Sequence, residues 1–166
     1  MMNLNLVFME DIMFKHKDLS VLFIIWFFMI FSIIPYGIIA FMVIQKESEV
    51  VFDANNDSYM LLLKILPVIS IIIGGVSVYL RRLFLKESFY SKFFTNNNVK
   101  SIYFITILLT SALGESITIF GLILVLLGKN MTLFIVFGAT ASVIMLFNKP
   151  NIEEYEKFKE NFESNN

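Results

Sequence analysis

The chain contains no cysteine and a single histidine among its 166 residues. The absence of cysteine excludes disulfide bonds, thiolate metal sites and cysteine nucleophiles. Because His16 stands alone, we expect neither a histidine-based metal site nor a catalytic triad. The sequence also lacks an HExxH motif and has no pair of acids within its hydrophobic runs. We therefore expect a protein that is not an enzyme, with no cofactor and no bound metal.

Charged residues are also scarce, at 16% of the chain, whereas 57% of the residues are hydrophobic. An average soluble domain is about 25% charged and about 45–50% apolar. A soluble domain of this length could not bury so much apolar surface, so the composition predicts contact with lipid. The net charge of -1 provides no basic field for nucleic acid. The expected partners are the lipid bilayer and other membrane protein subunits or further copies of this chain, but no nucleic acid.

Four long hydrophobic runs are present, at residues 19–44, 59–80, 102–127 and 131–147. As helices rising ~1.5 Å per residue, the first three reach roughly 33–39 Å and the fourth about 25 Å, against a hydrocarbon core of about 30 Å. Lipid offers the backbone no hydrogen-bond partners, so each run is expected to be helical. The sequence thus predicts an all-α polytopic protein with a single membrane domain, residues 1–166, that has four transmembrane helices.

Lysine and arginine are distributed unequally between the two sides of these four predicted helices. Ten lie before the first run, in the 81–100 connection or in the 148–166 tail, whereas only Lys46 and Lys129 lie on the other side. Cytoplasmic segments carry the excess of basic residues. We therefore predict that both termini are cytoplasmic, and that the protein resides in a bacterial inner membrane.

The 148–166 tail has the pattern of a short amphipathic helix. Asn151, followed three residues later by Glu154, is a suitable helix cap. Apolar residues then recur at helical spacing: Ile152, Tyr155, Phe158 and Phe162. This helix either lies against the membrane or its own bundle, or it presents Tyr155, Phe158 and Phe162 as a docking surface for a partner.

Two ionisable residues, Lys64 and Glu115, lie within the runs. Lys64 is near one end of the second run, where its long side chain can reach the headgroups; a partner for a carboxylate is its alternative role. Glu115 is at the centre of the third run, where a charged group costs about 2.5–3.5 kcal/mol to insert. Loss of water disfavours the charged form, so an unpaired Glu115 should be protonated, whereas a nearby cation would keep it ionised.

Small and hydroxyl-bearing residues surround Glu115 at helical spacing. We expect Ser111 and Thr118 to hydrogen-bond its carboxyl group, and with Lys64 these residues form the candidate ion- or proton-binding site. The expected packing positions are Gly114 and Gly121 in the third run, Ser70 and Gly74 in the second, and Gly138 and Ser142 in the fourth. The second, third and fourth helices are therefore predicted to pack around Glu115. The phenylalanine-rich first run is expected to face lipid, with a kink at Pro35 and Gly37, and the second run is expected to kink at Pro67.

Residues 111–124, with the sequence SALGESITIFGLIL, resemble the carboxylate helix of the proteolipid c subunit of rotary ATPases. In that family a mid-membrane carboxylate is followed by an aliphatic or aromatic pair and then by Gly-Leu, as here at Glu115, Ile119, Phe120, Gly121 and Leu122. The resemblance implies reversible ion or proton binding at Glu115 within a ring of identical subunits. It is confined to this helix, because the family's glycine-rich partner helix and its Arg-Gln-Pro loop are absent from the chain.

Two functions remain open on the sequence. The first is a small membrane protein that responds to ions or protons, or translocates them, with Glu115 as the protonatable group. The alternative is a non-catalytic accessory or scaffold subunit of a membrane complex, in which Glu115 joins helices through hydrogen bonds.

Overall fold

The computed structural model describes residues 17–46, 57–86 and 99–164, and the described part contains helices and short connections but no strand. Its helices are α2 (Lys17–Phe31), α3 (Ile33–Gln45), α4 (Asp57–Phe84), α6 (Val99–Gly128), α7 (Met131–Phe147) and α8 (Ile152–Glu163). The predicted all-α class is thus confirmed. The residues before 17 and the connections 47–56 and 87–98 lie outside the described part.

Three segments are long and apolar enough to cross a membrane: Leu19–Gln45, Asp57–Phe84 and Val99–Gly128. The fourth predicted span coincides with α7, which has only 17 residues. Together with Ile152–Phe162 it meets the same criterion as a broken pair, bent by 48°. The described part of the chain therefore has three candidate spans, or four if this pair is one span.

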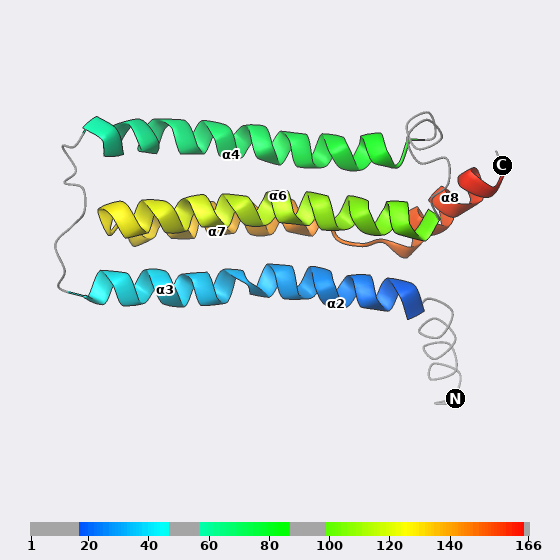
Figure 1. Ribbon diagram of the computed structural model, residues 1–166, viewed down its shortest axis with the longest axis horizontal. Coiled ribbons are helices and arrows are strands. Elements are labelled where there is room, and N and C mark those ends of the chain that lie inside the picture. Colours follow the sequence, from blue (N-terminus) through cyan, green and yellow to red (C-terminus); the bar gives the residue numbers. More distant parts are fainter. Residues whose placement is uncertain (1–16, 47–56, 87–98, 165–166) are drawn as a thin grey trace, which may run out of the picture.

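The helices lie side by side, with α6 at the centre (Figure 1). α6 packs against every other described helix, and its closest association is with α7. α4 flanks this central pair on one side, and the α2–α3 segment flanks it on the other (Figure 1). Glu115 lies on α6, so the helices that surround α6 supply the neighbours of this residue.

The first hydrophobic run is interrupted at Ser32, between α2 and α3. Pro35 has no backbone N–H, and its ring crowds the carbonyl group four residues earlier, that of Phe31. Ser32 Oγ donates to Met29 O at 2.6 Å beside the break. The first run is therefore broken just before Pro35, and α4 continues as a helix through Pro67; the kinks expected at Pro35, Gly37 and Pro67 stay predictions.

Glycines allow α7 to approach α6 closely. A Cβ atom on Gly121 would lie 2.7 Å from Phe137 Cβ, and one on Gly114 would lie 2.9 Å from Met145 Cγ. Real Cβ atoms do not approach other carbons so closely, so neither position accepts a larger residue without movement. The small residues of α6 thus set the spacing between the two helices.

Side chains from other helices complete the carboxyl end of α7. The last carbonyl groups of a helix have no partner within it, and α7 ends alongside the middle part of α6 rather than at its tip (Figure 1). Trp26 Nε1 donates to Met145 O at 3.0 Å, and Arg81 Nη1 donates to Phe147 O at 3.0 Å. Asn148 N also donates to Met145 O at 3.1 Å, so the side chains from α2 and α4 supplement the backbone hydrogen bonds at this end of α7.

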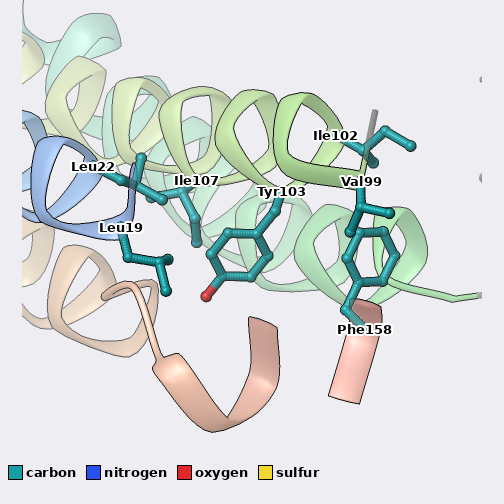
Figure 2. Packing of buried hydrophobic residues seen from close by; sticks show 7 residues of the cluster. All are labelled: Leu19, Leu22, Val99, Ile102, Tyr103, Ile107 and Phe158. Carbon is teal, nitrogen blue, oxygen red and sulfur yellow. The ribbon is translucent and has the colours of Figure 1, made fainter. Parts of the chain in front are cut away.

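The amphipathic tail helix is α8, and its apolar face is turned toward the bundle. Phe158 is 4% exposed and belongs to a buried cluster with residues of α2 and α6, whose members Figure 2 shows: Leu19, Leu22, Val99, Ile102, Tyr103 and Ile107. Tyr155 and Phe162 pack against the same cluster. Phe158 is thus buried within the chain, whereas Tyr155 and Phe162 are half-buried, which favours the interpretation as a helix lying on its own bundle. The apolar surface of α8 is used within the chain.

Candidate functional site

Glu115 is half-buried near the middle of α6, and its carboxyl group is bound from α3. Tyr36 Oη donates to Glu115 Oε1 at 3.0 Å. Tyr36 directly follows Pro35, so the phenol lies close to the break between α2 and α3. The prediction that the second, third and fourth helices pack around Glu115 did not include the first run, which supplies its hydrogen-bond partner.

The first run consequently has two faces. One carries exposed phenylalanines, with Phe28 69% exposed, in keeping with the predicted lipid-facing surface. The other carries Trp26 and Tyr36, which bond α7 and α6 respectively. Tyrosine and tryptophan are large apolar residues that usually find a hydrogen-bond partner when buried. Tyr36 is the only tyrosine of this run, and that was the signal that could have identified it.

Ser111 and Thr118 are fully buried, but their hydroxyl oxygens have no hydrogen-bond partner among the described residues. The prediction that they bond Glu115 is therefore wrong in this conformation. The two residues share a face of α6 with Glu115, because they lie four residues before it and three after it. The carboxyl group is turned toward Tyr36 instead, which leaves two buried hydroxyls one turn away on either side.

Lys64 is exposed on α4 and lies far along the bundle from Glu115. Ser77 Oγ donates to Thr110 O at 3.0 Å, and this pair fixes the register of the antiparallel helices α4 and α6. In that register Glu115 is level with Ile72, which is eight residues, or about 12 Å, from Lys64. Lys64 is therefore not the cation partner of Glu115.

The predicted packing residues lie at several helix contacts. Gly114 and Gly121 face α7, and a Cβ on Gly74 of α4 would lie 2.8 Å from Ile144 Cδ1 of α7. Gly138 lies closest to Ile33 of α3. Two hydroxyls bond their own helices: Ser70 Oγ donates to Leu66 O and Ser142 Oγ donates to Gly138 O, each at 2.8 Å.

A polar cluster that the sequence analysis did not identify lies where α7 gives way to α8. Asn151 caps α8, since its side chain accepts from Glu153 N at 2.9 Å. Glu154 does not complete the predicted capping arrangement. It forms an ion pair with Arg81, whose Nη2 also donates to Lys149 O at 2.9 Å. The cluster thus ties α4 to both sides of the α7–α8 connection.

Tyr103 and Asn148 extend this junction into the bundle. Asn151 N donates to Tyr103 Oη at 2.9 Å, and this hydroxyl donates to Asn151 O at 3.0 Å. Asn148 is 1% exposed, and its Nδ2 donates to Ser77 Oγ at 2.8 Å. Every polar side chain in this chain of contacts has a partner, so the junction is suited to holding the helix ends together.

The chemistry open to the Glu115 site is limited by what surrounds it. A carboxyl group bonded to a phenol can accept or release a proton, but this pair contains no nucleophile with an adjacent base. Among the residues that the structure describes, no group of three or more His, Asp or Glu side chains is placed to hold a metal ion. Comparisons of the chain with protein-family models, with curated proteins and with solved structures give no match.

Proposed function

We propose that the chain is a non-catalytic integral membrane protein that responds to protons, or to cations that compete with them, through Glu115. The observation that carries this proposal is the 3.0 Å hydrogen bond between Tyr36 Oη and Glu115 Oε1. It joins two apolar helices near the middle of α6. An apolar environment favours the neutral carboxyl, whereas hydrogen bonds to the ionised form favour the charge. A change in protonation would therefore alter how strongly α3 is held against α6.

The buried hydroxyls of Ser111 and Thr118 support a carboxyl group that has alternative partners. A buried polar group without a hydrogen bond costs about 1–3 kcal/mol. Residues three and four apart on a helix are neighbours, so a change of Glu115 rotamer would bring its carboxyl group toward these hydroxyls. Glu115 would then have two arrangements, one bonded to Tyr36 and one bonded to the two hydroxyls. Its protonation state would decide which arrangement is favoured. The local resemblance to the proteolipid carboxylate helix supports the same role for Glu115.

The decisive variant is Glu115→Gln, because glutamine keeps an oxygen for the Tyr36 hydrogen bond but does not titrate. We expect the distance between labels on α3 and α6, measured in liposomes, to change with pH in the wild type and to stay constant in the variant. A hydrophobic carbodiimide should modify Glu115 in the wild type. The control is Glu160→Gln on the exposed face of α8, which should behave as the wild type. The proposal fails if the distance does not depend on pH, or if Glu115→Gln follows the wild type.

The alternative is that the chain is an accessory or scaffold subunit, in which Glu115 holds helices together through hydrogen bonds. The same hydrogen bond favours it, because the bond fastens the first run to the bundle and Lys64 is too distant to serve as a cation partner. In this case Glu115→Gln should keep its partners in pull-downs from native membranes, whereas Glu115→Leu should lose them. Recovery of the chain without a stoichiometric partner would argue against this function.

A further inference from the structure

A groove of ≈ 210 Å³ runs between α4 and α7, and neither Tyr36 nor Glu115 lines it. Its walls come from three helices: Pro67, Ser70 and Ile71 of α4, Ile117 of α6, and Val136, Phe137 and Thr140 of α7. Ile71 is 76% exposed and Val136 is 55% exposed. The groove therefore opens on the outer surface of the bundle, at the depth where the helices would meet lipid.

The groove is apolar, although a serine and a threonine line it. Ser70 Oγ donates to Leu66 O at 2.8 Å, and Thr140 Oγ1 donates to Val136 O at 2.8 Å. Both hydroxyls thus use their hydrogen atoms within their own helices. The walls offer no donor to a bound polar group, and they suit a hydrocarbon chain.

Lys64 does not line the groove, but it lies about one turn of α4 before the lining residue Pro67. It precedes Pro67 by three residues and Ile71 by seven, so all three lie on one stripe of α4, with Lys64 about 4.5 Å beyond Pro67 along the helix. Lys64 is exposed, and no described side chain forms an ion pair or hydrogen bond with it. It lies toward the amino end of α4, from where its long side chain can reach the headgroup region.

We propose that this groove holds a phospholipid of the leaflet at the α3–α4 end of the bundle, with its phosphate group at Lys64 and an acyl chain along the groove. The charge of the lysine complements the phosphate, and the wall from Pro67 to Thr140 complements the chain. Lys64 has no structural role inside the bundle, and binding of a phosphate group explains its presence in an apolar helix. This inference does not depend on the function of Glu115, since the two sites share no residue.

The test measures phospholipid retained by the purified full-length chain, by native mass spectrometry after reconstitution into phosphatidylglycerol and into phosphatidylcholine. Lys64→Gln should lower retention of the anionic lipid about fivefold, because one basic residue near an anionic surface strengthens binding by about that factor. Lys64→Arg keeps the charge and should retain the lipid. Thr140→Phe fills the groove and should lower retention of both lipids. Ala139→Phe, an exposed neighbour outside the groove, is the matched control and should have no effect.

Equal retention by the wild type, Lys64→Gln and Thr140→Phe would overturn the proposal, because it would mean that only the general lipid shell is bound. A wild type that appears as a dimer and a Thr140→Phe variant that appears as a monomer, with lipid retention unchanged, would also overturn it and assign the groove to a second copy of the chain. Because Lys64 is exposed, the Lys64→Gln result remains decisive even if Thr140→Phe does not fold.

Discussion

The contact between α6 and α7 at Gly121 can be tested by adding one methyl group. In Gly121→Ala the new Cβ would lie 2.7 Å from Phe137 Cβ and 3.3 Å from Phe134 Cα. Carbon atoms pack best at about 3.5–4.0 Å, so the two helices must separate by roughly 1 Å. Overpacking of this kind costs about 1–3 kcal/mol. Alanine is favoured over glycine in a helix by about 1 kcal/mol, which offsets part of the cost.

We therefore expect Gly121→Ala to lower the free energy of unfolding by up to about 2 kcal/mol, since the helix propensity of alanine offsets part of the crowding cost. The matched control is Gly75→Ala in α4, where a Cβ atom would meet nothing within 4 Å. That variant should be as stable as the wild type or slightly more stable. Reversible unfolding in mixed micelles, followed by circular dichroism, measures both. Equal stability of the two variants would refute the packing of α7 on α6 that is described above.

Two further substitutions test contacts that reach across the bundle. Tyr36→Phe removes one interhelical hydrogen bond and should lower the free energy of unfolding by about 0.6 kcal/mol, the average for such bonds in a membrane protein; no change by the same unfolding assay would mean that this bond does not form. Arg81→Gln removes the ion pair with Glu154, so hydrogen exchange of the α8 amides should rise while that of α6 stays constant. Unchanged exchange in α8 would show that its apolar face alone holds the helix in place.

Local sequence patterns were enough to predict where the chain is helical, and for α7 and α8 also where the helix begins. Apolar runs with few charges indicate helices, because an unpaired backbone in lipid is too costly. The predicted start of the fourth run coincides with the start of α7 at Met131, where the Asn130 side chain accepts from Thr132 N at 3.1 Å. Asn151 likewise caps α8, as predicted. These features depend on residues close together in the chain, so a single sequence reveals them.

The partner of Glu115 could not be predicted in this way. Hydropathy does not distinguish a face that meets lipid from one that meets another apolar helix, so the first run looked like a purely lipid-facing helix. Only the packing of α3 against α6 brings Tyr36 to Glu115, across a separation of 79 residues. The docking of Phe158 against α6 has the same origin. The sequence by itself determined which segments are helical and that an acid lies at the centre of one of them. The tertiary structure decided which side chain that acid meets, because contacts between helices depend on their relative rotation and register.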